Sequence, residues 1–232
     1  MPGKFTFYSN QITDETAFFD ENEHRHAIVT LRNKVGDKIE FTDGLGNCFL
    51  GEIERIEKSQ FQARITDKKN MHTQSNLQIC IGIIKSTERL EWLVEKCTEI
   101  GVGGIHFMET KNSERGRINL ERAQKIAISA LKQSHGSFLP VIDAITWRAA
   151  LQIEAENKCI ANAEQSFSAG WGEKCQRNIS TNLLIGPEGD FTLMEMQDAI
   201  ALDYETVSLG NSILRTETAA VVACAVFALA AK

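Results

Sequence analysis

Two segments in the last quarter of the chain each run from an apolar strand into a glycine turn and then into a polar helix start. The first is LLIGPEGDFT at residues 183–192, and the second is VSLGNSILRTETAA at residues 207–220. Parallel strands that end in glycine loops place those loops side by side at the carboxyl edge of a sheet, where open α/β folds bind ligands. The two segments therefore predict one ligand pocket built largely from backbone.

The residues of these loops indicate what the pocket holds. The G-x-G-x-x-G pattern and the Walker lysine of phosphate-binding loops are both absent. Residues 178–214 contain no Lys, Arg or His but six acidic residues, a balance that favours a cation over a polyphosphate. Asp190 or Thr192 is a candidate N-cap for a helix after the first loop, and Thr216 is one after the second.

Both loops resemble those of the SPOUT class of RNA methyltransferases, and within it the RsmE family, which methylates N3 of one uridine in 16S ribosomal RNA. The family pattern is LLIGPEGG and LG-x-R-I-L-R-x-E-T-A, against LLIGPEGD and LGNSILRTETA here, so that Asp190 replaces a glycine and Ser212 an arginine. Further upstream, KSTERLEWLVEKCTEIGV at residues 85–102 is similar to the family's K-x-x-x-x-E-x-x-x-x-K-x-x-E-L-G-V helix.

The resemblance implies S-adenosylmethionine as the cofactor, and its sulfonium suits an acidic, glycine-lined pocket. It implies that main-chain groups of the loops hold the adenine and that Asn162 ends a third strand beside them. An ordinary strand-to-helix turn is the alternative for each glycine taken alone. The implied cofactor-binding residues are Asn162, Ile185, Gly186, Pro187, Glu188, Gly189, Leu209, Gly210, Asn211, Ile213 and Leu214.

Arg215 and Glu217 are the candidate catalytic residues. Uridine N3 must lose its proton, and a fixed guanidinium at Arg215 would stabilise the negative charge that spreads onto the ring carbonyl oxygens. Glu217 would accept the proton or orient Arg215. A carboxylate in a first helical turn is equally what the helix dipole favours, so both interpretations stay open. In KQSHGS at residues 132–137, Gln133 matches the family and the family's arginine is missing.

The chain divides into two regions that differ in the pattern of their apolar residues. Residues 35–66 alternate apolar and polar positions between glycine turns, which predicts a small antiparallel barrel. From residue 77 strands and helices alternate, which predicts a mostly parallel sheet with flanking helices. We expect a PUA-like barrel over residues 1–72 and a SPOUT domain, trefoil-knotted as the resemblance implies, over residues 73–232.

The net charge of −6 argues against a nucleic-acid partner, but the local distribution favours one. KNSERGR at residues 111–117 is a basic loop, and a second basic cluster lies at residues 24–32. A solvated surface loop is the alternative for the first. With the resemblance, both indicate contact with 16S ribosomal RNA in the small subunit, and the candidate RNA-binding residues are Arg25, Arg32, Lys85, Lys111, Arg115 and Arg117.

Composition excludes several other classes of protein. The six cysteines form no C-x-x-C pair and no metal-ligand cluster, so we expect reduced, mostly buried thiols and no metal. The first ten residues lack the apolar core of a signal peptide, and the apolar run at 219–231 is too short to span a bilayer. We therefore expect a cytoplasmic protein without a membrane partner.

The resemblance also implies a homodimer whose active site is completed across the subunit interface. Three functions remain open at this point. The first is a uridine-N3 methyltransferase acting on 16S ribosomal RNA. The second is a SPOUT methyltransferase acting on transfer RNA or on another ribosomal position. The third, which the missing arginines suggest, is an RNA-binding or assembly module that has lost transfer activity.

Overall fold

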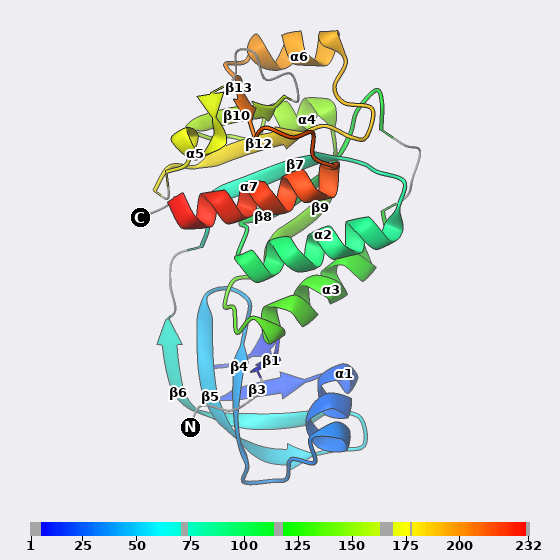
Figure 1. Ribbon diagram of the computed structural model, residues 1–232. Coiled ribbons are helices and arrows are strands. Elements are labelled where there is room, and N and C mark those ends of the chain that lie inside the picture. The colour runs from blue at the N-terminus through cyan, green and yellow to red at the C-terminus, as the bar shows by residue number, and fades with distance from the viewer. Residues whose placement is uncertain (1–5, 71–73, 114–117, 163–168, 177, 231–232) are drawn as a thin grey trace. The chain divides into compact units, whose positions relative to one another are not determined.

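The structure is a computed structural model that describes residues 6–70, 74–113, 118–162, 169–176 and 178–230. Figure 1 shows the chain coloured from its amino to its carboxyl end. It divides into two compact units. The first comprises residues 1–74 and 128–139, and the second comprises residues 75–127 and 140–232. The division into sequence domains at residues 72 and 73 stays a prediction.

Six strands among the described residues of the first unit form a sheet that is antiparallel except where β1 pairs with β4. In the order β1-β4-β5-β6-β3-β2, the sheet curls around one core (Figure 1). The helix α1 (Glu21–His24) continues into a π-helix at Arg25–Thr30, which the sequence analysis did not anticipate. The strands are β1 (Thr6–Tyr8), β2 (Gln11–Ile12), β3 (Thr16–Phe19), β4 (Lys38–Thr42), β5 (Asn47–Ile56) and β6 (Phe61–Asn70).

Aromatic rings fill the core of this unit. Phe19 stacks on Phe61 with ring centroids 4.3 Å apart, and Phe41 meets Phe19 edge-on at 5.2 Å. Side chains on a strand alternate between its two faces, so Phe18 is exposed while its neighbour Phe19 is buried. The alternation predicted for residues 35–66 is confirmed by the burial of Ile39, Phe41, Phe49, Ile53, Phe61 and Ala63 in the same core.

In the second unit, seven strands within the described residues form a sheet in which every pairing is parallel. Their order is β11-β13-β10-β12-β7-β8-β9. The predicted α/β architecture is confirmed. The strands are β7 (Leu77–Gly82), β8 (Gly104–Glu109), β9 (Val141–Thr146), β10 (Asn157–Ala161), β11 (Ala169–Gly170), β12 (Thr181–Ile185) and β13 (Glu205–Ser208).

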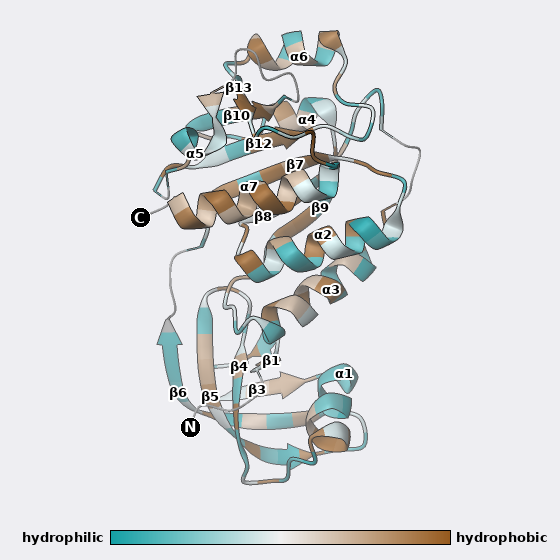
Figure 2. Ribbon diagram, in the orientation of Figure 1, coloured by the Kyte–Doolittle hydropathy of each residue, from teal (hydrophilic) through white to brown (hydrophobic). Residues whose placement is uncertain are grey.

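Helices cover this sheet. α7 packs on α2, β7 and β12, while α4 and α6 contribute to an apolar cluster that includes Cys80 and Leu184. Figure 2 shows hydrophobic residues concentrated along the strands and α7. The helices of this unit are α2 (Thr87–Ile100), α4 (Trp147–Leu151), α5 (Trp171–Lys174), α6 (Leu193–Ile200) and α7 (Thr216–Ala230). A further helix, α3 (Leu120–Gln133), belongs to this unit up to residue 127 and to the first unit from residue 128.

Local sequence features mark the ends of α2, but they do not mark the edge strand β9. α2 lies within the family-like segment at residues 85–102, begins after an N-cap at Ser86, and ends at Gly101, whose left-handed φ of 94° suits glycine. Residues 141–146, which were not predicted as a strand, form the edge strand β9. Its side chains are exposed or half-buried, so VIDAIT lacks the apolar run of a central strand.

The thiols are free, and five of the six are buried, as predicted; Cys48 is half-buried. Burial raises the pKa of the thiols of Cys159 and Cys175 to about 12. At neutral pH such thiols stay protonated, which makes them poor nucleophiles. Among the described residues, no helix combines the length and apolarity needed to cross a bilayer.

The pair Phe18 and Phe19 offers a matched test of the first core. Phe19→Ala should lower the free energy of unfolding by about 3–5 kcal/mol, because it removes a buried ring that stacks on Phe61. Denaturant unfolding monitored by circular dichroism measures the change. Phe18→Ala, in the same strand on the exposed face, should cost less than about 1 kcal/mol. Equal losses for the two variants would contradict the described register of β3.

Candidate functional site

Three strand ends meet at one edge of the parallel sheet. β10 lies between β12 and β13 and is parallel to both, so the three carboxyl ends point the same way. The backbone N–H of Asn162 donates to the carbonyl of Val207 at 3.0 Å, which carries the pairing of β10 and β13 past the end of β10. The two glycine loops that leave β12 and β13 therefore lie beside Asn162, as the sequence predicts.

The loops enclose a pocket of about 470 Å³, within the range of small-molecule sites. Of the eleven cofactor-binding residues proposed from the sequence, nine line it; Gly189 and Asn211 do not. Arg215 also lines it. The full lining is Arg89, Ala161, Asn162, Ile185, Gly186, Pro187, Glu188, Asp190, Leu209, Gly210, Ser212, Ile213, Leu214, Arg215, Thr216 and Ala219.

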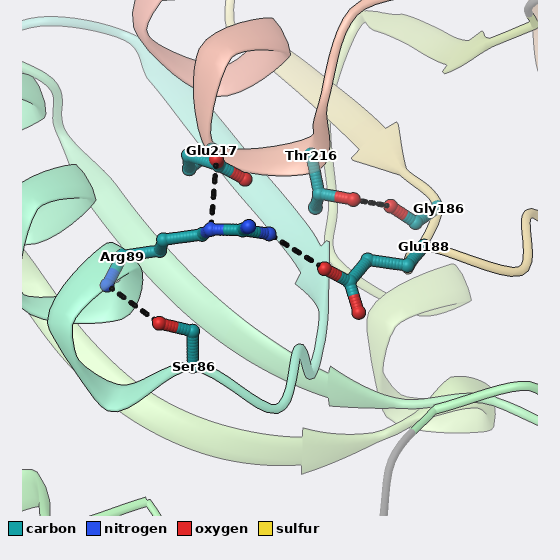
Figure 3. A network of polar contacts seen from close by, with 6 residues as sticks. All are labelled: Ser86, Arg89, Gly186, Glu188, Thr216 and Glu217. Carbon is teal, nitrogen blue, oxygen red and sulfur yellow. Dashed lines mark hydrogen bonds and ion pairs between the residues drawn. The ribbon is translucent and has the colours of Figure 1, made fainter.

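One side-chain hydrogen bond ties the two loops together. The hydroxyl of Thr216 donates to the carbonyl of Gly186 at 2.9 Å. The expectation that Thr216 caps α7 is thereby corrected, because Thr216 is the first residue of that helix and its side chain serves the neighbouring loop. The bond fixes the first turn of α7 against the loop that follows β12 (Figure 3).

The first loop ends in a capping box. Thr192 is the N-cap of α6, and its side chain and that of Glu195 satisfy each other's backbone N–H groups. Of the two predicted caps, Thr192 is right and Asp190 is wrong. Asp190 instead sits in the loop at a φ of 57°, where its carboxylate accepts from the N–H of Phe191 at 2.8 Å.

Two glycines are required at these loops for different reasons, Gly82 for space and Gly210 for its backbone conformation. A Cβ at Gly82, the last residue of β7, would lie 2.4 Å from the backbone nitrogen of Pro187, so only glycine lets the first loop pass. Gly210 has a φ of 132°, and a Cβ there would meet no heavy atom within 4 Å. Gly210 was predicted from the sequence as a pocket residue. The need for glycine at position 82 was not predicted, because Pro187, which Gly82 contacts, is distant in the chain.

Arg89 is the charged residue of the lining that was not predicted from the sequence. It comes from the first turn of α2, and its Nη1 lies 2.7 Å from Oε1 of Glu188. Its Nε lies 3.5 Å from Oε1 of Glu217. Figure 3 shows the guanidinium between the two carboxylates, one from the first loop and one from α7. The only sequence signal was its place in the family-like helix at residues 85–102.

Arg89 also changes the charge expected of the pocket. The last quarter of the sequence predicts an acidic site, but folding brings Arg89 in from α2. The lining then holds Arg89 and Arg215 against Glu188 and Asp190. The pocket is therefore balanced in charge, which corrects the expectation from composition.

The two candidate catalytic residues differ in their surroundings. Arg215 is exposed at the pocket, and its guanidinium makes no ion pair with any residue the structure describes. Glu217 is buried and contacts Arg89, and it is not among the lining residues. Its Oε2 is buried without a hydrogen-bond partner among the described residues. The described residues contain no group of three or more His, Cys, Asp or Glu side chains that could hold a metal ion.

The candidate RNA-binding residues that are described lie on the surface. Arg25 pairs with Glu21 across one helical turn at 3.6 Å, and Arg32, with a φ of 60°, is exposed. In the second unit, Lys85 and Lys111 are exposed. Arg115 and Arg117 lie outside the described residues.

The start of the basic loop is held against the glycine loop. Nδ2 of Asn112 donates to the carbonyls of Gly189 and Asp190 at 3.0 and 3.1 Å. The backbone N–H of Lys111 donates to Glu195 at 2.8 Å. His135, in contrast, is hydrogen-bonded through Nδ1 to the hydroxyl of Thr6 within the first unit.

Comparisons with known proteins bear on these loops and on the whole chain. A family model described as an RNA methyltransferase domain matches residues 71–228, and one described as an RNA methyltransferase PUA domain matches residues 19–66. The ribosomal RNA small subunit methyltransferase E of Rickettsia conorii is 30% identical over 88% of this chain and 86% of its own. The chain belongs to the ribosomal RNA small subunit methyltransferase E family.

Solved structures agree with this membership of the methyltransferase E family. A probable rRNA methyltransferase from Porphyromonas gingivalis is 34% identical, with a TM-score of 0.86 and 95% of each chain covered. The Neisseria gonorrhoeae methyltransferase E, bound to S-adenosyl methionine, is 28% identical with a TM-score of 0.82 and 96% coverage of each chain. The predicted fold class is thereby confirmed, while the trefoil knot stays an implication of the resemblance.

The bond between Thr216 and Gly186 can be tested by an isosteric change. Thr216→Val should lower the free energy of unfolding by about 0.5–1.5 kcal/mol, because the half-buried carbonyl of Gly186 loses its donor without a change in side-chain shape. Thermal and denaturant unfolding measure the loss. Thr218→Val is the matched control in the same helix and should change stability by less than about 0.5 kcal/mol. A Thr216→Val variant as stable as the parent would show that the bond does not hold the loops.

Proposed function

We propose that this chain is an S-adenosylmethionine-dependent methyltransferase that modifies N3 of a uridine in 16S ribosomal RNA. One observation carries the proposal: the ends of β10, β12 and β13 line a single pocket in a member of a family named for small-subunit ribosomal RNA methylation. The Neisseria gonorrhoeae relative is described as bound to S-adenosyl methionine.

The residues of the pocket fit this cofactor. Gly210 faces open space on the side where any other residue would carry a Cβ, so a ligand can approach its backbone. Main-chain groups around Ile185, Gly186, Leu209 and Leu214 supply hydrogen-bond donors and acceptors for a flat base. When bound, S-adenosylmethionine supplies a methyl group on a positively charged sulfur that leaves readily. The protein then has to position the uridine and stabilise charge.

Arg215 is the group that we assign to charge stabilisation. It lines the pocket, and since it forms no ion pair within the described residues, its guanidinium is available to a ligand. Removal of the N3 proton places negative charge on the two uracil carbonyl oxygens, and a fixed guanidinium beside them lowers the energy of that state. Glu217 does not line the pocket and pairs with Arg89, so the proton acceptance or orientation of Arg215 expected of it stays a prediction from the sequence.

The surroundings of the pocket suggest how RNA reaches it. Asn112 fixes the start of the basic loop beside Gly189 and Asp190, so that Lys111 lies on the same edge of the sheet as the pocket. We propose that Lys111 and Lys85 contact RNA phosphates, with Arg25 and Arg32 doing so in the first unit. We also propose a homodimer in the cytoplasm, with the site completed by the partner subunit.

Labelled methyl transfer tests the function. The protein is incubated with radiolabelled S-adenosylmethionine and small ribosomal subunits from cells that lack the gene, and the product is mapped by mass spectrometry. We expect one label per subunit on N3 of a uridine in 16S RNA. Label in transfer RNA or at another ribosomal position would show that the enzyme has a different substrate from the one proposed. Tight cofactor binding without label in any RNA would overturn the enzymatic function and support the RNA-binding or assembly module that lacks transfer activity.

Arg215→Ala should separate binding from turnover. It should retain cofactor affinity but lower the transfer rate by about 10²–10³-fold, because a preorganised charge at the developing anion is lost. Isothermal titration calorimetry and single-turnover labelling measure the two effects. Arg148→Ala, an exposed arginine on α4 that does not line the pocket, is the control and should behave as the parent. A fully active Arg215→Ala would remove Arg215 from this role.

Gly210→Val should abolish cofactor binding. Its side chain would occupy the open space beside the second loop, and a φ of 132° is unfavourable for valine. Gly101→Val is the matched control, because Gly101 also has a left-handed φ and open space but lies at the end of α2. It should lower stability and keep affinity. Unchanged calorimetric affinity of Gly210→Val would contradict the assigned pocket.

A further inference from the structure

Arg89 connects three separate segments of the second unit. Its backbone belongs to the first turn of α2, Glu188 belongs to the loop after β12, and Glu217 belongs to the first turn of α7. α7 in turn is bonded to the same loop through Thr216 and Gly186. The guanidinium thus lies where the framework of helices meets the loop that lines the pocket (Figure 3).

The start of α2 fixes the backbone of Arg89. The side chain of Ser86 caps the helix by accepting from the N–H of Arg89 at 3.4 Å. A guanidinium is planar and carries several donors in a rigid fork, so one such group can face two carboxylates at once. Here Nη1 faces Glu188 and Nε faces Glu217.

The two carboxylates contribute differently. The side chain of Glu217 is 7% exposed, whereas that of Glu188 is 46% exposed. A buried carboxylate that loses its cation is strongly destabilised, while an exposed ion pair contributes little. The buried carboxylate of Glu217 therefore determines the position of the guanidinium. The guanidinium in turn fixes the position of the Glu188 carboxylate.

We propose that Arg89 is a positioning residue: anchored by Glu217, it holds Glu188 and the first loop in the shape that binds the cofactor. This inference rests on the proposed function. It also gives Glu217 a role through Arg89, since Glu217 itself does not line the pocket. The bond from Thr216 and the bonds from Asn112 hold other points of the same loop, at Gly186 and at Gly189 and Asp190.

Calorimetric titration with S-adenosylmethionine and with S-adenosylhomocysteine tests the proposal without any transfer reaction. Arg89→Gln should raise the Kd of both ligands about tenfold, because Glu188 and its loop lose their fixed position. Arg89→Lys should recover part of the affinity, since a single ammonium keeps the charge but cannot face both carboxylates. Glu188→Gln should raise the Kd as well, and the double variant Arg89→Gln with Glu188→Gln should be no weaker than Arg89→Gln alone.

Arg122 of α3 provides a matched control, because its guanidinium pairs with a carboxylate of α2. Its Nε and Nη2 lie 3.1 and 3.0 Å from the two carboxylate oxygens of Glu91 in α2, and neither residue lines the pocket. Arg122→Gln should leave the Kd of both ligands unchanged. A rise equal to that of Arg89→Gln would mean that any ion pair on α2 has the same effect, and would overturn the proposal.

Loss of folding must be told apart from loss of positioning. Should Arg89→Gln fail to fold, the variant that combines Arg89→Gln with Glu217→Gln removes the unpaired buried charge, and circular dichroism checks its fold. A folded double variant with a tenfold weaker Kd supports the proposal, and one with the affinity of the parent overturns it. A parent that binds neither ligand would overturn the proposed function itself.

Discussion

The site depends on the parallel pairing of β10 with both of its neighbours. Because β10 lies between β12 and β13, the backbone after each of the three strands leaves the sheet at one edge. Strand pairing brings Asn162, Gly186 and Gly210 to one pocket, although they come from different parts of the sequence. A fold that paired these strands in another order would separate the loops and leave no pocket.

Given that pairing, a small number of side chains fixes the loops. Thr216 bonds the start of α7 to the first loop, the capping box of Thr192 ends that loop in α6, and Asn112 holds its tip. Arg89 adds a cation between Glu188 and a buried carboxylate. Side chains thus hold the loops in place, and the pocket is lined largely by their backbone.

Local patterns in the sequence were sufficient wherever a segment determines its own structure. The helix at residues 87–100 followed from the alternation of strands and helices and from its similarity to the family's helix. The edge strand β9 was missed because a half-exposed strand carries no apolar run. The cap at Thr216 was wrong because its hydroxyl serves Gly186, thirty residues earlier in the chain. Such errors arise where a distant partner competes with the local pattern.

The sequence by itself determined the two classes of domain, the glycine loops and the family resemblance, because periodicity, turn residues and motifs are properties of neighbouring residues. Only the tertiary structure decided that Arg89 enters the pocket, that the lining is balanced in charge, and that Gly82 must lack a side chain for Pro187 to pass. Each of these depends on the distance between residues far apart in the chain, and strand order sets that distance.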